Sequence, residues 1–194
     1  MRSAPLPSAR RVILVSETGI DIGDEDVLRA HQHGLLHRAF SIFVFNSRGE
    51  TLLQCRSTAK RTFGGLWTNT CCGHPRPGEP VLTAAQRRLG EEMGIAVVLE
   101  EAARFTYRAS DAVSGFTEHE YDHILVGRFD GSSDPDPQEV ADCKWVGMDA
   151  LRLNLGADPS SYSPWLRPAL EALDQRSRSV GATGRVGSTP PDPS

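Results

Sequence analysis

The sequence predicts a domain of the α/β (α+β) class, in which a mixed β-sheet sandwich is flanked by helices. Three observations lead to this expectation: short β-branched or aromatic segments recur along the chain, one segment carries a helical apolar stripe, and few other helices are indicated. A chain of 194 residues with 39% hydrophobic and 24% charged residues is typical of one soluble globular domain.

One short strand and then a hairpin are predicted in the first third of the chain. Arg11–Ser16 is short and β-branched, and Ala39–Phe45 is apolar and rich in aromatic residues. A turn at residues 46–49 (Asn-Ser-Arg-Gly) then leads into Glu50–Gln54, which favours an antiparallel pair. Further strands are expected at Ile95–Leu99, Phe105–Ala109, Thr117–Phe129 and Cys143–Val146.

Two helices are indicated. The clearer one is Pro80–Met93, with Gly94 well placed as its C-cap. Its apolar stripe consists of Leu82, Ala85, Leu89 and Met93. The second is Pro164–Leu173, with Ser163 as the N-cap and Pro164 at the first helical position.

Composition also predicts the limits of the folded part. We expect a flexible N-terminus over residues 1–10, one domain over 11–175 and a disordered tail over 176–194, because the tail is rich in Ser, Gly and Pro and lacks apolar periodicity. We see no internal repeat.

Charge and hydropathy exclude two classes of partner. A net charge of −4 without a dominant basic face argues against nucleic-acid binding driven by bulk charge. No apolar run approaches the roughly 20 residues that span a bilayer, so we expect no membrane association. The run from Val12 to Val15 is too short for the core of a signal peptide, and we therefore expect a cytoplasmic protein.

The four cysteines do not indicate a structural zinc site or a disulfide framework. Cys71 and Cys72 are adjacent, a poor geometry for a disulfide, and no CxxC spacing occurs. A reactive thiol in a reducing compartment stays open. Cys55 and Cys143 are interpreted as buried packing residues.

One segment carries a motif with fixed spacing, G-x5-E-x7-R-x-U-x-E-E-x-G-U, where U is aliphatic. The matching residues are Gly73, Glu79, Arg87, Leu89, Glu91, Glu92, Gly94 and Ile95. This is the Nudix box. On a helix, Arg88 and Glu92 lie one turn apart, as do Arg87 and Glu91, so a cation and a carboxylate can together hold a phosphate and its Mg²⁺. A plain amphipathic surface helix is the alternative.

The chain departs from the usual box at Arg88, where Nudix hydrolases usually carry Glu. The change weakens a metal site for hydrolysis and adds a cation that can grip phosphate.

Several further motifs resemble one family. WTN-x-x-CGHP, LLHRAFS, YRA, E-x-E and SPW all occur between Val12 and Trp165. In these features the chain resembles the type 1 isopentenyl diphosphate isomerases, which use the Nudix fold for a proton-transfer reaction. The resemblance implies interconversion of isopentenyl diphosphate and dimethylallyl diphosphate, a 1,3-allylic rearrangement in isoprenoid biosynthesis.

A metal site is indicated by strand periodicity as well. Glu118 and Glu120 share one strand face, and His119 and His123 the other. Two carboxylates on one face need a cation or a proton between them. His31, His37 and His74 could complete a site of three nitrogens and two carboxylates, which suits Mn²⁺, Zn²⁺ or Fe²⁺ better than Mg²⁺. In the resemblance these five residues are the metal ligands. His33 is the alternative to His31.

The resemblance also implies the catalytic residues. Cys72 would be one acid/base, and Glu120, assisted by Tyr107, would be the other, on the opposite face of the substrate. Trp165 would offer its ring to the carbocation. For Tyr107 and Trp165 the alternative is core packing, and Cys71 is interpreted as a bystander.

The diphosphate is expected to contact Arg56, Lys60 and Arg88. By resemblance, Mg²⁺ would bridge the diphosphate and Glu92, with the backbone carbonyl of Cys72 as a further ligand. A solvated basic loop is the alternative for Arg56 and Lys60.

One position departs from this family. Members of the family commonly have a Lys four residues before the first metal-binding His, where this chain has Val27. Either Arg29 substitutes or the affinity for substrate is lower.

Two other functions compete with the isomerase. One is a Nudix hydrolase of nucleoside diphosphate derivatives, and the other is a non-catalytic Nudix-like binding module. The resemblance implies a monomer.

Overall fold

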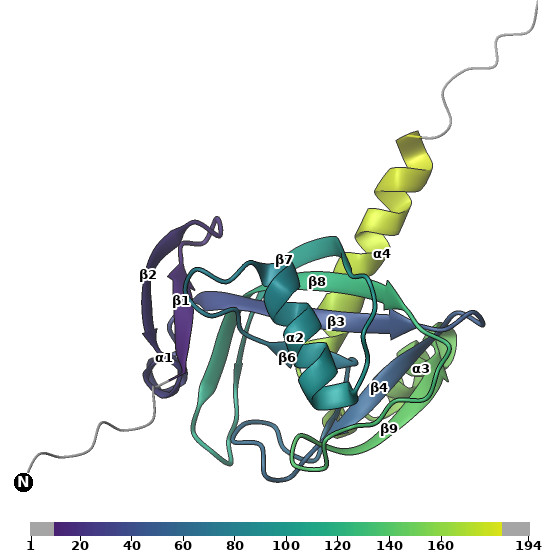
Figure 1. Ribbon diagram of the computed structural model, residues 1–194, viewed down its shortest axis with the longest axis horizontal. Helices are drawn as coiled ribbons and strands as arrows, with labels where there is room; N and C mark the ends of the chain where they lie inside the picture. Colours follow the sequence, from purple (N-terminus) through teal and green to yellow (C-terminus); the bar gives the residue numbers. More distant parts are fainter. Residues whose placement is uncertain (1–9, 184–194) are drawn as a thin grey trace, which may run out of the picture.

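The computed structural model describes residues 10–183, and nine strands in this range form one mixed sheet (Figure 1). The strands are β1 (Arg11–Val15), β2 (Asp21–Asp26), β3 (His37–Phe45), β4 (Glu50–Arg56), β5 (Trp67–Thr68), β6 (Cys71–Gly73), β7 (Glu100–Ser110), β8 (Thr117–Arg128) and β9 (Val140–Gly147). The helices are α1 (Val27–His33), α2 (Val81–Met93), α3 (Met148–Ala157), the 3₁₀ turn η1 (Pro159–Ser161) and α4 (Leu166–Thr183).

Strand β3 is the centre of the sheet. It pairs in parallel with β8 along its whole length, from His37↔Glu120 to Phe45↔Arg128. Its other edge is shared in turn by β1, β6 and β4. The apolar run in β3 is buried on both faces, as expected for a central strand with parallel pairing.

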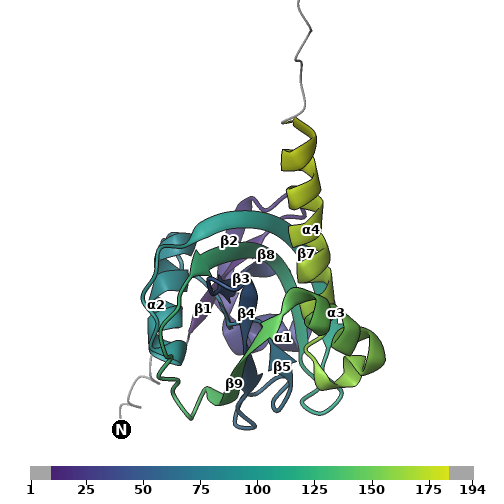
Figure 2. The ribbon, with the colours of Figure 1, turned by 90° about the vertical axis from the view of Figure 1, so that its right-hand side faces the viewer.

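Helices cover the two faces of the sheet, α2 on one side and α3 with α4 on the other (Figure 2). Phe40, Ile42 and Val44 of β3 point to the α2 side and pack against Leu89. Phe43, one position out of phase, belongs to the core that α3 and α4 cover. The strand period of two thus divides a single run of β3 between two cores.

The end of the sheet near the N-terminus carries β1, β2 and α1 (Figure 1). Asp26 caps α1 by accepting hydrogen bonds from Leu28 N and Arg29 N. Gly34 ends the helix in the left-handed conformation, with φ 59°. This short helix packs against β8 and presents His31 to it.

The prediction of a strand at Ile95–Leu99 is wrong. These residues form an irregular segment between α2 and β7. Ile95 and Leu99 are buried because the segment covers the α2-side core. It crosses the sheet so closely that a Cβ at Gly127 would lie 2.9 Å from Leu99. Burial without ladder pairing therefore produced the strand-like pattern.

The helix around the Nudix box is confirmed, with its C-cap at Gly94 (φ 65°) and its first residue one position later than predicted. One member of the predicted stripe is wrong, because Leu82 is 43% exposed. Ala84, beside Ala85, takes the buried position instead.

The bounds of several other predicted elements differ from those in the structure. β3 begins two residues early, at His37, and pairs with β4 only at Phe45↔Thr51, so the hairpin is confirmed only at its turn. β7 begins at Glu100 rather than Phe105. The elements β2, α1, β5, β6 and α3 were not predicted.

Helix α4 also differs from the prediction. It begins at Leu166, so Ser163 and Pro164 precede it by a turn rather than capping it. It continues to Thr183 and so enters the segment predicted to be disordered from Arg176. The rest of the predicted tail and of the N-terminus, residues 184–194 and 1–9, lies outside the described residues.

Within the described range, none of the helices has the length and apolarity needed to cross a bilayer.

Candidate active site

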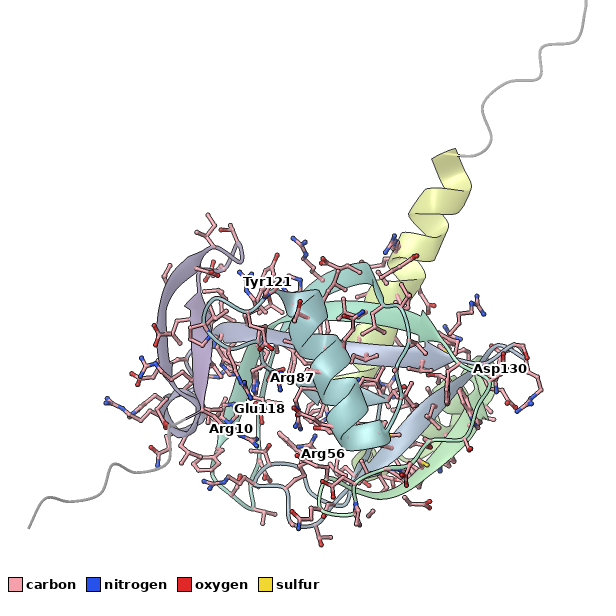
Figure 3. The ribbon with its side chains drawn as sticks, in the orientation of Figure 1. Arg10, Arg56, Arg87, Glu118, Tyr121 and Asp130 are labelled. Atoms are coloured by element: carbon pink, nitrogen blue, oxygen red, sulfur yellow. The ribbon has the colours of Figure 1, made fainter. Side chains whose placement is uncertain are left out.

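Five potential metal ligands converge at the end of the sheet where α1, β3, β6 and β8 meet. They are His31, His37, His74, Glu118 and Glu120, whose ligand atoms all lie within 4.8 Å of one another. Glu118 lies at the opposite end of the molecule from Asp130 in Figure 3. The structure therefore brings together the five residues that the sequence predicts. His33, the alternative to His31, is exposed on α1.

The donor atoms face one another as the ligands of a single ion do. His31 Nε2 and Glu118 Oε2 lie 3.1 Å apart, yet both are buried and neither makes a hydrogen bond. Two ligands at right angles, each about 2.1 Å from a Zn²⁺, would be about 3 Å apart. Buried polar atoms without partners are rare, and a divalent cation would satisfy both. These residues therefore fit a divalent metal ion.

Hydrogen bonds around the cluster hold the donors in place. His37 Nδ1 donates to Leu35 O (2.8 Å), which directs Nε2 toward the cluster. Thr62 Oγ1 donates to Glu118 (2.7 Å), and the Tyr107 hydroxyl donates to Glu120 (2.6 Å). Each carboxylate thus keeps one oxygen for the cluster and uses the other as an anchor.

Burial and mutual charge shift the pKa values of the cluster. Burial and the neighbouring imidazoles lower the pKa of His31 to about 3, and burial lowers that of His74. Burial acts in the same direction on His37, but Glu120 outweighs it and raises the His37 pKa. Burial and the charge of Glu120 raise the pKa of Glu118 to about 7. A metal would therefore have to displace protons from Glu118 and His37.

Glu120 itself behaves in the opposite way. Burial would raise its pKa, but hydrogen bonds from His37 and His74 hold the pKa well below the ordinary value. The His74 Nε2 to Glu120 Oε1 distance is 2.7 Å. Glu120 is therefore ionised at neutral pH.

The thiol of Cys72 lies on the same face of the sheet as Ser41. β6 pairs with β3 at Ser41↔Cys72, so Cys72 and His74 share that face, whereas Cys71 points toward α2. Cys72 Sγ contacts Ser41 Oγ (3.6 Å) and donates to Asn69 Oδ1 (3.2 Å). Strand alternation therefore puts one of the two adjacent thiols at the site and the other in the core.

Burial and the carboxyl of Asp122 raise the pKa of the Cys72 thiol to about 12. Asp122 lies behind the thiol and accepts a hydrogen bond from Ser41 Oγ (2.7 Å). At neutral pH the thiol is therefore protonated, the form in which it can deliver a proton.

The rings of Phe63, Tyr107 and Trp165 form an aromatic wall between the thiol and Glu120, with Trp165 in the middle. Its Nε1 donates to Asn69 Oδ1 (3.2 Å), the same atom that accepts from Cys72. Its ring centroid lies 5.8 Å from that of Tyr107, which bonds Glu120, and 5.4 Å from that of Phe63, in an edge contact. Trp165 is 3% exposed, as the alternative of core packing requires, and its role at the site stays a prediction.

Arg56 is buried against this wall. Its guanidinium carbon lies 5.3 Å from the centre of the Trp165 ring, and it donates to the carbonyls of Thr62 (2.9 Å) and Phe63 (3.2 Å). Figure 3 labels it below α2, within the molecule. Two of the Arg56 nitrogens thus donate to carbonyls of the loop, and only the rest of the guanidinium is available to bind an anion.

Lys60 and Arg88, the other two predicted diphosphate contacts, lie together. Lys60 Nζ is 3.2 Å from Glu92, and Arg88 contacts Glu92 one helical turn away. Both cations also contact Glu139, which follows the long loop after β8. The pairing of Arg88 with Glu92 and of Arg87 with Glu91 on α2 is confirmed.

Sequence reasoning did not single out five residues that contact the site: Ser41, Asn69, Thr62, Phe63 and Glu139. Ser41 and Asn69 lie inside LLHRAFS and WTN, so the motifs carried their positions but not their contacts. Phe63 is a non-glycine residue with φ 51°, held by the bond from Arg56 and by Asp111, which accepts from its N–H (3.2 Å). Nothing in the sequence pattern marks Glu139.

The interpretation of two other cysteines is confirmed only in part. Cys143 is partly exposed but packs against the α2-side core, whereas Cys55 is partly exposed and its thiol contacts the carbonyl of Gly65 (3.5 Å). Cys71 is the cysteine buried in the core.

Comparison with known proteins identifies the class. Residues 35–166 match the NUDIX domain. An isopentenyl-diphosphate Delta-isomerase of Nocardia farcinica is 49% identical over 164 residues, covering 84% of this chain and 94% of the relative. One of Halorhodospira halophila is 46% identical over 162 residues, covering 82% and 93%. The chain therefore belongs to the Nudix family and, within it, to the isopentenyl-diphosphate Delta-isomerases.

Solved structures confirm the fold. A protein of Deinococcus radiodurans, 18% identical, superimposes with a TM-score of 0.67 over 84% of this chain and 98% of its own. The MutT protein of Methanosarcina mazei, 21% identical, gives 0.61 over 74% and 96%. At these identities the likeness shows the fold alone, which is the predicted mixed sheet flanked by helices.

Proposed function

We propose that the protein interconverts isopentenyl diphosphate and dimethylallyl diphosphate. The observation that carries the proposal is the pair of groups at the two ends of the aromatic wall. The Cys72 thiol and Trp165 Nε1 donate to the same oxygen of Asn69. Glu120 accepts a hydrogen bond from Tyr107, whose ring lies beside that of Trp165. The names of the bacterial relatives support the same reaction.

The chemistry needs two proton transfers on opposite faces of a five-carbon chain. One of the pair Cys72 and Glu120 adds a proton to the terminal alkene carbon. The other removes a proton from the carbon next to the diphosphate-bearing one, and the double bond forms there. The substrate gains and loses one proton, so its composition and charge do not change. An alkene is a very weak base, and the burial of both groups keeps competing water away.

The resulting tertiary carbocation needs stabilisation without a nucleophile. The Trp165 ring face can supply it through its negative quadrupole. The guanidinium carbon of Arg56 already lies over this ring, 5.3 Å from its centre. The hydrogen bond from Arg56 to the loop holds this cation at a defined place beside the wall. The Tyr107 hydroxyl, whose pKa burial raises well above its ordinary value, stays protonated and keeps its bond to Glu120.

Two metal ions fit the proposal. The cluster His31, His37, His74, Glu118 and Glu120 would hold Mn²⁺ or Zn²⁺, because imidazole nitrogens favour such ions. A bound cation lowers the pKa of the groups that ligate it and would hold Glu120 in place. Mg²⁺ would accompany the diphosphate at Glu92 and the backbone carbonyl of Cys72, with Arg56, Lys60 and Arg88 as anion contacts.

Hydrolysis is less well supported. The position of the usual Nudix glutamate holds Arg88, whose guanidinium neutralises Glu91, Glu92 and Glu139 rather than adding a metal ligand. The remaining sequence-based expectations, a monomer in the cytoplasm that binds neither nucleic acid nor membrane, stay predictions.

Product analysis tests the proposal. Purified protein loaded with Mn²⁺ or Zn²⁺ is incubated with isopentenyl diphosphate and Mg²⁺, and the products are followed by phosphorus and proton NMR. We expect dimethylallyl diphosphate with both phosphates retained. Release of phosphate or of isopentenyl monophosphate without any isomer would contradict the proposal and favour the hydrolase.

A further inference from the structure

Four side chains of alternating charge meet where α2, the loop after β4 and the end of the loop before β9 come together. Lys60 contacts both Glu92 (3.2 Å) and Glu139. Arg88 also contacts both, and its distance to Glu139 is 3.0 Å. Each cation therefore touches both carboxylates, and the four charges cancel.

The two carboxylates in this arrangement are not equivalent. Glu92 is 1% exposed, and its second oxygen accepts from Gln54 Nε2 (3.3 Å) and the Cys71 thiol (3.5 Å). The Glu139 side chain is 22% exposed, and its two oxygens divide the two cations between them. Glu139 thus offers the carboxylate oxygens that an ion arriving from solvent can reach.

The surroundings of Glu139 favour its ionised form. Burial would raise its pKa, but the hydrogen bonds and charges of Lys60 and Arg88 outweigh burial and lower the pKa to about 2. It is a carboxylate throughout the neutral range.

A buried acceptor without a partner lies beside these four charged side chains. Gln54 is 1% exposed, and its amide is oriented by bonds from Nε2 to Thr70 O (3.0 Å) and Glu92 Oε2. Its Oε1 has no hydrogen-bond partner. Buried amide oxygens are normally satisfied, so a donor is missing here. Mg²⁺ usually keeps several of its waters when it binds carboxylates and phosphates, and such a water is a suitable donor.

We propose that Glu139 is the second carboxylate of the Mg²⁺–diphosphate subsite, beside Glu92. In the free protein it neutralises Lys60 and Arg88. When diphosphate oxygens replace it at these cations, it becomes available to Mg²⁺, directly or through a water. The inference rests on the proposed function, since that function supplies the diphosphate.

Binding of inorganic pyrophosphate, measured by calorimetry with and without Mg²⁺, tests the inference without catalysis. The quantity compared is the ratio of the dissociation constant without Mg²⁺ to that with Mg²⁺. For Glu139→Gln we expect this ratio to fall about tenfold from the wild-type value. Binding without Mg²⁺ should be equal or tighter, because a competing anion has been removed from Lys60 and Arg88.

Glu91→Gln is the matched control. Glu91 also pairs with Arg88 (2.7 Å), but it lies on the exposed side of α2, with 45% of its side chain accessible. Its ratio should stay within about twofold of the wild-type value. An unchanged ratio in Glu139→Gln, or an equal fall in both variants, would overturn the inference. Thermal melting establishes that both variants are folded.

The outcome is separable from that of the proposed function. Wild-type isomerisation together with an unchanged ratio in Glu139→Gln would overturn the inference alone. Absence of isomerisation together with the tenfold fall would overturn the proposed function and leave Glu139 as a Mg²⁺–pyrophosphate ligand.

Discussion

Cys71 and Cys72 are neighbours in sequence with opposite surroundings. Strand alternation in β6 directs Cys71 to the core under α2, where its thiol contacts Glu92. Cys72 faces Ser41 and Asn69. The type of residue alone could not separate them; the motif resemblance did, and the pairing Ser41↔Cys72 supplies the physical reason.

Asn69 links the thiol and the aromatic wall. Its Oδ1 accepts from Cys72, Trp165 and Thr68, and its Nδ2 donates to the carbonyls of Ile42 (3.1 Å) and Cys71 (2.9 Å). These two donor bonds fix the orientation of the amide. One side chain thus sets the positions of both the Cys72 thiol and the Trp165 ring.

We predict that Asn69→Ala lowers kcat about a hundredfold, because both groups lose their common anchor. Loss of buried hydrogen bonds should also reduce the free energy of unfolding by about 1–3 kcal/mol. Steady-state kinetics and urea unfolding measure the two effects.

Asn46→Ala is the control for this prediction. Asn46 is equally buried but lies in the β3–β4 turn, where it bonds Glu50. Its removal should reduce stability and leave kcat within about twofold. A similar loss of kcat in both variants would show that stability alone limits activity.

At the scale of elements, one face of β3 and β8 changes from polar to apolar along its length. On β8 the inward residues are Glu118, Glu120, Asp122 and Ile124. The last of these joins the core under α3 and α4, while the first two join the metal cluster. The alternation of Glu118 and Glu120 with His119 predicted this face from the sequence. The elements α1 and β6 were not predicted, because such short elements carry no periodicity of their own; the resemblance alone supplied His31 and His74.

This face predicts how metal binding depends on pH. Glu118 has a pKa of about 7, and the pKa of His37 is raised above its ordinary value. A metal must displace their protons, so its affinity rises with pH and levels off above the pKa values. Titration of the metal-free protein with Mn²⁺ from about pH 6 to about pH 8 should show tighter binding and fewer protons released as the pH rises. An affinity independent of pH over this range would refute the pKa shifts.

The end of α2 provides a prediction about stability. Gly94 has a φ of +65°, and a Cβ there would lie 2.8 Å from Asp134 O. Gly94→Ala should therefore reduce the free energy of unfolding by about 1–3 kcal/mol. Gly78 has a φ of +78° with nothing within 4 Å, so Gly78→Ala tests strain without the clash and should cost less. Equal losses in urea unfolding would mean that the contact with Asp134 contributes nothing.

At the scale of the whole molecule, the sheet holds together groups from distant parts of the chain. The metal cluster joins residues from 31 to 120, and the thiol site reaches Trp165. The resemblance predicted which residues meet, and alternation predicted their faces where strands are long. The partners Glu139 and Phe63 could not be predicted, because loops bring them in by tertiary contacts that leave no local pattern. The strand predicted at Ile95–Leu99 failed for a related reason, since burial in a crossing segment mimics a strand.

The central claim is that a thiol and a carboxylate move protons on a five-carbon diphosphate. The most direct measurement is conversion of isopentenyl diphosphate in D₂O, with Mg²⁺ and the metal-loaded protein, followed by deuterium analysis of the product. The wild-type protein and Cys71→Ala should give deuterated dimethylallyl diphosphate, whereas Cys72→Ala should give at least about a thousandfold less. Equal conversion by Cys72→Ala, or dimethylallyl diphosphate without deuterium from the wild type, would contradict the account.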